Sequence, residues 1–527
     1  MSTGHEDFVN ETFSELKPLH IAHSHAIWEA ATTGTEEATE REKEAQGAMM
    51  RFWADPTRFN TADDLRLKER TEDALLARQI QLIYLSAAKA QQDEETIEKI
   101  TQLESEVRQA YYNFRAEVNG KQLTNNELDD ILKKSANSED VRKAWEAGKQ
   151  IGPKVSGQVR DLARVRNQAS QRQGYRDHFQ KSLTLNEIDE DELMSLFDEL
   201  EQVTRTPFAE LKDEIDERRA AHFGITKEDL NPWHYADSFF QSPPPMGEID
   251  FDTYFADKDP SELGVKTYDG IGLEVRDILL RSDLFAREGK DQSAFCIDMD
   301  REGDIRTLNN LEPNRRWTRT LLHELGHAVY DKYIDYDLPW ILRRPAHSLS
   351  TEAVAILMGS LVNNREWLER VLEVQDSDAE RISQFAMEHE RASRLIFTRW
   401  CLVMTHFERA FYGNPESDVD NLWWDLKERF QLLRRPAGRD APDWAAKYHI
   451  ALVPVYYQNY ELGQLVSSQM EYFLTMEVGS LVENASAGKW LLDRAFRAGA
   501  TEDWSDHVQS MTGEPLNPRY FIESLRS

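Results

Sequence analysis

The amino-acid sequence predicts a mostly α-helical protein with one small β-hairpin. Residues that break helices are scarce. The chain has 24 Gly and 18 Pro among 527 residues, about 4.6 and 3.4 per cent, whereas average proteins contain about 7 and 5 per cent. Good helix formers are abundant, and long stretches repeat apolar residues at helical spacing. Only one segment, near residue 300, has the short apolar runs and the glycine-containing turn that are typical of a hairpin.

Five long stretches in the first half of the chain have a helical pattern. In the second stretch, Leu75, Leu82 and Ile83 are separated by seven and eight positions, which places them on one helical face. The predicted stretches run from Glu36 to Arg51, from Ala62 to Gln91, from Glu94 to Glu117, from Glu139 to Arg172 and from Glu190 to His222. Their many charges indicate solvated faces and carry no functional assignment.

The helical pattern breaks at two proline sites, Asn231-Pro232 and the Pro243–Pro245 tract. A run of prolines cannot continue a helix and is typical of a boundary or a hinge. We therefore predict a single domain over residues 1–527, with lobes of about 1–245 and 246–527 and a hinge near Pro243–Pro245.

The predicted hairpin follows this break. Its two runs extend from Ser293 to Asp300 and from Ile305 to Leu308, and the turn between them contains Gly303. Helical patterns resume after the hairpin and continue to the end of the sequence.

Charge and cysteine content exclude several classes of function. The 63 Lys and Arg face 95 Asp and Glu, so the formal net charge is −32, which disfavours nucleic acid and anionic membranes as partners. The two cysteines, Cys296 and Cys401, are too few for a disulfide framework or a cysteine-ligated zinc site. The polar N-terminus predicts no signal peptide, and no run of 18 apolar residues occurs, so we expect a cytoplasmic protein.

The segment around residue 325 has the spacing of a zinc site. It contains His323, Glu324 and His327 as an H-E-x-x-H motif. On a helix the two histidines lie four residues apart on one face, so both imidazoles can reach one ion. Glu324 can then hold the attacking water and take its proton. The alternative is a chance match on an amphipathic helix whose histidines pack or cap.

A third protein ligand is expected, because a catalytic zinc site combines three ligands with one open position. Glu352 is the candidate, 25 residues after His327. It follows the N-cap candidates Ser348 and Ser350, so we expect it in the first turn of an apolar, buried helix. A lone carboxylate there needs a partner. The alternative is a carboxylate that only stabilises the helix N-terminus.

A second cluster of reactive side chains begins at Lys447. Amide hydrolysis passes through an oxyanion, and hydrogen-bond donors aimed at that oxygen stabilise it. His449 can donate in this way, and so can Tyr456, Tyr457 and Tyr460, which can share one helical face because of their spacing. Considered alone, such tyrosines more commonly pack with their hydroxyls at the surface.

These motifs together resemble the angiotensin-converting enzyme family and its bacterial relatives. Between His323 and Trp367 the chain has His-Glu-x-Gly-His, then Asp-Leu-Pro, then Leu-Arg-Arg, then Glu352. Further similar segments are Leu123 to Leu132, Lys143 to Gly148, Arg164 to Tyr175, Ser293 to Phe295, Lys447 to His449 and Thr512 to Ile522. The resemblance extends from about Leu123 to the end and more loosely before it. Thimet-type oligoendopeptidases share the same arrangement of zinc ligands and the tyrosine-rich segment.

The resemblance implies a two-lobed helical shell with a deep central channel and a small hairpin at the active site. One zinc ion per chain would be bound by His323, His327 and Glu352. Glu324 would be the general base and later the proton donor to the leaving amine.

The resemblance also implies roles for residues outside the zinc site. His449 and a tyrosine, Tyr460 ahead of Tyr457, would stabilise the oxyanion. Ser293 and Ala294 would pair main chain to main chain with an extended substrate. Lys447 and Tyr456 would contribute to substrate binding.

Some positions depart from the family pattern. Converting enzymes hold the C-terminal carboxylate of the peptide with Gln, His, Lys and Tyr. The Lys is kept as Lys447, but the Gln and His positions fall near Asp237 and Asp291, and acids there would repel a carboxylate. The family's carboxylate four residues after the glutamate ligand is Ile356, which leaves Asp331 as a substitute partner for a zinc histidine.

We therefore predict a zinc metallopeptidase that hydrolyses short oligopeptides, either as a peptidyl-dipeptidase or as a thimet-type oligoendopeptidase. A different class of function is a non-catalytic peptide-binding pseudoenzyme. Against the pseudoenzyme, the chain keeps both histidines, both glutamates, the donor histidine and the tyrosine run.

Overall fold

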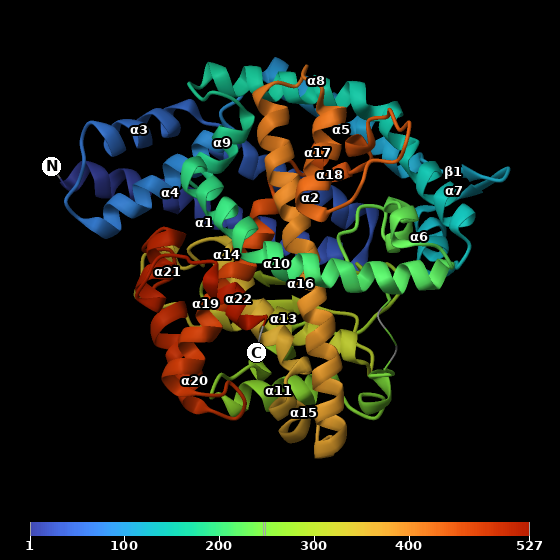
Figure 1. Cartoon of the computed structure of the whole chain (residues 1–527). Coiled ribbons are helices and arrows are strands. Elements are labelled where there is room, and N and C mark those ends of the chain that lie inside the picture. The colour runs from blue at the N-terminus through green and yellow to red at the C-terminus, as the bar shows by residue number, and fades with distance from the viewer. Residues whose placement is uncertain (1, 246, 248, 526–527) are drawn as a thin grey trace. The chain divides into compact units, whose positions relative to one another are not determined.

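The computed structural model describes residues 2–245, 247 and 249–525, and most of its regular structure is helical (Figure 1). Within these residues the strands form two antiparallel hairpins. The prediction of a mostly α fold is therefore confirmed. No helix in the described part of the chain combines the length and the apolar character that crossing a bilayer requires.

The chain folds into two compact units that are interleaved in sequence. Unit 1 comprises Met1–Gln91, Ile249–Ala386 and Leu462–Ser527, and unit 2 comprises Gln92–Glu248 and Met387–Glu461. The lobes predicted from the sequence were instead consecutive. One switch between units, after residue 248, lies close to the proline tract, whereas residue 246, where the second lobe was expected to begin, is outside the described residues. The hinge stays a prediction.

Unit 1 contains the two ends of the described chain and the middle segment with the H-E-x-x-H motif. Its helices are α1 (Ser2–Thr33), α2 (Glu36–Trp53), α3 (Pro56–Leu67), α4 (Ala74–Ala90), α11 (Pro260–Gly270), α12 (Arg276–Arg281), α13 (Arg315–Lys332), α14 (Ser348–Ser360), α15 (Arg365–Arg370), α20 (Ala485–Leu491), α21 (Trp504–Thr512) and α22 (Arg519–Ser524). The hairpin of β3 (Phe295–Asp298) and β4 (Ile305–Leu308) also belongs to unit 1 and packs on α13.

Unit 2 is helical apart from one short hairpin. Its elements are α5 (Glu94–Asn113), β1 (Ala116–Val118), β2 (Lys121–Leu123), α6 (Asn125–Lys134), α7 (Ser138–Lys149), α8 (Ile151–Arg172), α9 (His178–Leu185), α10 (Glu190–Phe223), α17 (Val419–Gln431) and α18 (Tyr448–Leu452). Two long helices contain residues of both units: α16 (Asp376–Gly413) and α19 (Tyr457–Val478).

Capping explains where the predicted helical stretches begin and end. The stretch from Glu190 becomes α10, which starts after the capping Asp189 and stops at Gly224, a residue in the left-handed conformation. The stretch from Ala62 to Gln91 divides into α3 and α4 because the Asp73 carboxylate accepts from the Leu76 amide and starts a new helix. The stretch from Glu139 likewise divides, at Gln150, into α7 and α8.

The predicted hairpin is present as β3 and β4, with Phe295 opposite Leu308. The other hairpin, β1 and β2, replaces the end of the helix expected to reach Glu117. Its turn is Asn119-Gly120, and both residues have positive φ, 52° and 78°. An Asn-Gly pair is the usual sequence signal for such a turn, so this hairpin was visible in the sequence.

Large aromatic side chains form the core of each unit. The largest fully buried ones include Trp145, Trp400, Trp423 and Trp444 in unit 2, and Trp367, Tyr268, Tyr330 and Tyr520 in unit 1. In unit 2, rings from α16 and α17 meet edge to face, with the centroids of Trp400 and Trp423 5.8 Å apart. Burial on this scale gives each unit a hydrophobic core of its own.

Candidate metal centre

Helices α13 and α14 pack along each other and carry the candidate ligands. The helix α13 begins after Asn314, whose side chain accepts from the Trp317 amide at 2.8 Å. Gly326 lies inside the H-E-x-x-H motif, and a Cβ at this position would lie 2.8 Å from Cα of Ala355 in α14. Only glycine permits this approach. Gly326 therefore lets α14 pack close enough to α13 for its side chains to reach the histidines.

The side chains of His323, His327 and Glu352 converge. Nε2 of His323 lies 3.7 Å from one carboxylate oxygen of Glu352, and Nε2 of His327 lies 3.5 Å from the other. One ligand atom from each of the three residues lies within 4.8 Å of the other two. Ligands about 2.0–2.1 Å from a tetrahedral ion are about 3.3 Å apart, so these residues fit one metal ion.

The protonation states also suit a metal. Burial lowers the pKa of His323 to about 4, and Arg319 adds to this effect. Burial together with His323 lowers the pKa of His327 to about 3. Both imidazoles are therefore neutral at pH 7, which is the form that coordinates metals.

Glu352 is the fifth residue of α14, so it lies beyond the first turn in which the sequence analysis expected it. The helix starts earlier because His347 is the N-cap and its Nδ1 accepts from the Leu349 amide at 3.2 Å. The helix α19 covers Glu352, since a Cβ at Gly463 would lie 3.3 Å from its Cγ. A role limited to the helix N-terminus therefore does not fit its position.

Glu324 lies beside the three candidate ligands and is only 7% exposed. Burial, together with the neighbouring Glu352, raises the pKa of its carboxyl to about 8. A buried carboxyl with a raised pKa is the usual form of a general base or acid.

The second nitrogen of each histidine also has a partner. Nδ1 of His327 lies 2.8 Å from Oγ1 of Thr351, and His323 hydrogen-bonds the Ala355 backbone. Asp331 had been the expected partner, but Thr351 takes this place. Asp331 is instead buried near Asp298. Burial raises the pKa of Asp331, and the charge of Asp298 adds to this effect. Thr351 was not predicted from the sequence, although it directly precedes Glu352.

Ser293 and Ala294 precede β3 rather than belonging to it. The Ser293 amide donates to Oδ1 of Asp291 at 2.8 Å. Asn310 donates to the Asp291 carbonyl at 3.0 Å and so fixes the same segment. Whether Ser293 and Ala294 pair with substrate stays a prediction.

The second predicted cluster lies in unit 2. His449 is in α18, and its ring centroid is 5.0 Å from that of Tyr457, the first residue of α19. Burial lowers the pKa of His449 to about 4, and its buried Nδ1 has no hydrogen-bond partner among the described residues. Tyr456 and Tyr460 are more exposed and meet edge to face at 5.0 Å.

The turn between α18 and α19 has a strained backbone. Val455 has φ 54°, a conformation that β-branched residues rarely adopt. Two hydrogen bonds hold it: its amide donates to Oε1 of Glu408 at 2.8 Å, and its carbonyl accepts from Gln458 at 2.7 Å. The turn fixes the spacing between His449 and the tyrosines, and strain of this kind is common at functional sites.

Lys447 is buried and donates to Oε1 of Gln241 at 2.9 Å. Burial lowers the pKa of Lys447 to about 8, with Asp237 opposing the shift. The carboxylate of Asp237 accepts hydrogen bonds from the backbone amides of Phe239 and Gln241 at 2.7 and 3.2 Å, and these bonds fix its orientation. Gln241 was not predicted from the sequence, although it lies only four residues after Asp237.

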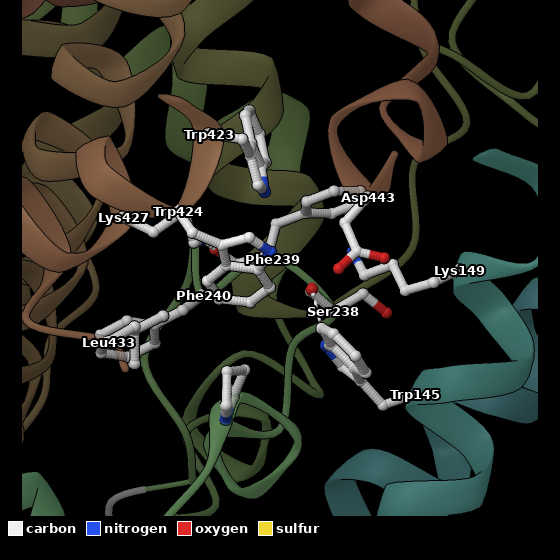
Figure 2. A pocket seen from close by; sticks show the side chains of 11 residues that line it. Trp145, Lys149, Ser238, Phe239, Phe240, Trp423, Trp424, Lys427, Leu433 and Asp443 are labelled. Carbon is white, nitrogen blue, oxygen red and sulfur yellow. Dashed lines mark hydrogen bonds between the residues drawn. The ribbon is translucent and has the colours of Figure 1, made fainter. Parts of the chain in front are cut away.

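Phe239 lines a small pocket together with Trp145, Lys149 and Lys427 (Figure 2). Nζ of Lys149 lies 3.2 Å from the centroid of the Phe239 ring, and Nζ of Lys447 lies 5.2 Å from it. Lys427 donates to the Phe239 carbonyl at 2.5 Å. Two lysines thus lie near the Phe239 ring, and a third contacts its backbone carbonyl.

Comparison with known proteins places the chain in a family. The family model described as angiotensin-converting enzyme matches residues 2–211 and 290–518. The chain belongs to the angiotensin-converting enzyme family. The matched segments of this family member contain His323, Glu324, His327 and Glu352, and also the segment from Lys447 to Tyr460. Gln241 and the proline tract lie outside them.

This family member is also similar to a bacterial relative, the protein named Carboxypeptidase 1 of Bacillus subtilis (strain 168). The two are 22% identical over 260 residues, which is 44% of this chain and 51% of the relative. The chain thus spans about half the length of this curated relative. The family resemblance predicted from the motifs is confirmed by the family model.

Proposed function

We propose that this protein is a zinc metallopeptidase that hydrolyses short oligopeptides. The observation that carries the proposal is the convergence of His323, His327 and Glu352, with ligand atoms within 4.8 Å, beside the buried Glu324. Two neutral imidazoles and one carboxylate make the donor set of a catalytic zinc site, in which a water takes the fourth position. Family membership supports the same assignment.

Glu324 is the proton carrier of the proposed reaction. Zinc, when bound, supplies Lewis-acid activation of the scissile carbonyl and of the attacking water. Glu324 takes the proton of that water and later gives it to the leaving amine. Both steps need one group that accepts a proton and then releases it, and a carboxyl beside the metal ligands can do both.

His449 and Tyr460 are the proposed donors to the oxyanion. At pH 7 the imidazole of His449 is neutral, since burial lowers its pKa to about 4, so it can donate one N–H without a strongly hydrated charge. The phenol of Tyr457 is more buried, and burial raises its pKa. Tyr460 therefore remains the preferred tyrosine.

The contacts of Lys447 favour peptidyl-dipeptidase activity over internal cleavage. An ammonium and an amide side by side, Lys447 with Gln241, can bind the C-terminal carboxylate of a peptide. The expected repulsion from Asp237 is reduced, because backbone amides already neutralise part of its charge. Tyr456, Ser293 and Ala294 complete the proposed substrate contacts.

Cleavage of an internally quenched peptide with a free C-terminus tests this function. We expect chelator-sensitive release of C-terminal dipeptides, identified by mass spectrometry, and much slower cleavage of the C-terminally amidated peptide. Internal cuts in both peptides would instead support a thimet-type oligoendopeptidase.

Glu324→Gln tests the general base. We expect kcat to fall by at least about 10²-fold, since general acid–base catalysis contributes 10²–10⁴-fold, while zinc bound per chain stays unchanged. The control is Glu288→Gln, a change of an exposed glutamate in unit 1. Wild-type protein that binds zinc and peptide but cleaves nothing would favour the pseudoenzyme.

A further inference from the structure

A cavity in unit 2 lies behind the turn that joins α18 and α19. Its volume is about 200 Å³, and its lining includes Glu104, Arg166, Ser170, His178, Lys181 and Pro454. This is far more than the roughly 10–15 Å³ that one water requires. The exposed Gln92 also lines it, so solutes can enter from that side.

Lys181 is the unusual residue of this cavity. The residue is only 5% exposed, yet its ammonium makes no hydrogen bond or ion pair with any residue that the structure describes. Burial alone lowers its pKa to about 8, with no carboxylate near enough to oppose the shift. The group is therefore mostly charged at pH 7, and the cavity that it lines is the space from which a counter-charge can reach it.

The other charges at the cavity are already balanced. The Arg166 guanidinium donates to Oε1 of Glu104 at 2.7 Å, and it also contacts the Ala451 carbonyl and the Tyr412 hydroxyl. Burial lowers the pKa of His178 well below its usual value, so its ring is neutral. One positive charge, that of Lys181, therefore remains without a counter-charge.

We propose that this cavity binds a small organic carboxylate through Lys181. A lysine ammonium offers three donors to a carboxylate, and the single excess charge matches a singly charged anion. The volume exceeds what one halide ion would fill. The residues involved are separate from Lys447 and Gln241 and from the metal ligands.

The bound carboxylate also stabilises the turn between α18 and α19. Pro454 of this turn lines the cavity. Arg166, which lines the cavity, donates to the Ala451 carbonyl at 2.7 Å on one side of Pro454. On the other side, Glu408 accepts from the Val455 amide at 2.8 Å. Occupancy of the cavity therefore slows local opening of residues 451–457.

Acetate binding to the full-length protein tests the proposal without any activity measurement. We expect acetate to raise Tm and to bind in calorimetry, more strongly than chloride at the same ionic strength. Lys181→Met weakens acetate binding at least tenfold, whereas Lys99→Met, a change of an exposed lysine of the same unit, leaves it unchanged.

Two further measurements keep the proposal falsifiable if a variant is unstable. Without acetate, Lys181→Met should melt at the same or a higher temperature, because it removes an unpaired buried charge. Acetate should slow hydrogen exchange in residues 451–457 of the wild type and not of Lys181→Met. Equal binding of acetate by both proteins, an equal effect of chloride, or a lower Tm of acetate-free Lys181→Met would each overturn the proposal.

Discussion

At the scale of single residues, Thr351 is the partner that fixes the ring of His327. Its hydroxyl lies 2.8 Å from Nδ1, while Nε2 faces Glu352 at 3.5 Å. A partner at one ring nitrogen sets which nitrogen carries the proton and where the other nitrogen points. Thr351 is thus a positioning residue for the candidate metal centre.

Thr351→Val tests this role, because valine keeps the shape of threonine and removes the hydroxyl. We expect the zinc dissociation constant, measured by competition with a chromophoric chelator, to rise 10- to 100-fold. Thr351→Ser restores the hydroxyl and should recover most of the affinity. Equal affinities of the valine and serine variants would show that the hydroxyl does not position His327.

The residues of the candidate site differ in how far the sequence revealed them. His323, Glu324 and His327 follow from a fixed spacing on one helix, and Glu352 from a lone carboxylate on an apolar helix. Thr351 and Gln241 could not be predicted in the same way. Their roles depend on which side chains face each other across α13 and α14, or between a loop and Lys447.

At the scale of elements, the turn between α18 and α19 depends on a buried carboxyl of α16. Glu408 is 1% exposed and accepts from the amide of the strained Val455. Burial raises the pKa of Glu408 to about 8, although Val455 and Arg166 oppose the shift. The protonated carboxyl keeps a carbonyl oxygen as acceptor, so protonation does not break this contact.

Stability should therefore depend on pH through Glu408. Its pKa is higher in the folded state, about 8, than the ordinary 4.5, so the folded protein binds the proton more tightly. The stability that this group contributes is complete below about pH 4.5 and is lost as pH rises to about 8. Glu408→Gln keeps the acceptor and removes the titration, so its advantage over wild type should grow across that window.

Urea unfolding at several pH values measures this difference. We expect a gain of up to about 5 kcal/mol above pH 8, at 1.4 kcal/mol per pKa unit, and none at pH 4. Glu98→Gln, a change of an exposed residue in the same unit, is the control and should show no such trend. A gain that is the same at pH 4 and pH 9 would contradict the pKa argument.

Helices were easier to predict than the short elements between them. The stretch of α10 was predicted to within one residue because its ends carry an acidic cap and a glycine. The division of one predicted helix into α3 and α4 was not foreseen, since apolar periodicity continues across the local cap at Asp73. The spacing of apolar residues indicates which face of a helix is buried, whereas capping residues determine where a helix begins and ends.

At the scale of the whole molecule, all three candidate metal ligands belong to unit 1. Metal binding should therefore stabilise unit 1 first. Zinc at 100 times its dissociation constant adds about 2.7 kcal/mol to the free energy of unfolding. Chelation should lower Tm and speed hydrogen exchange in α13 and α14, with little change in α5 and α8 of unit 2. A uniform change in both units would contradict this expectation.

Interleaving of the units also has a consequence for synthesis on the ribosome. Glu352 emerges 111 residues before Gly463, the residue of α19 that lies against it. At 5–20 residues per second, this delay is roughly 6 to 22 seconds. Unit 2 is complete in sequence at residue 461, whereas unit 1 still lacks its last segment. A nascent chain thus passes through a stage in which one unit is complete and the other, with the metal ligands, still lacks the segment that covers Glu352.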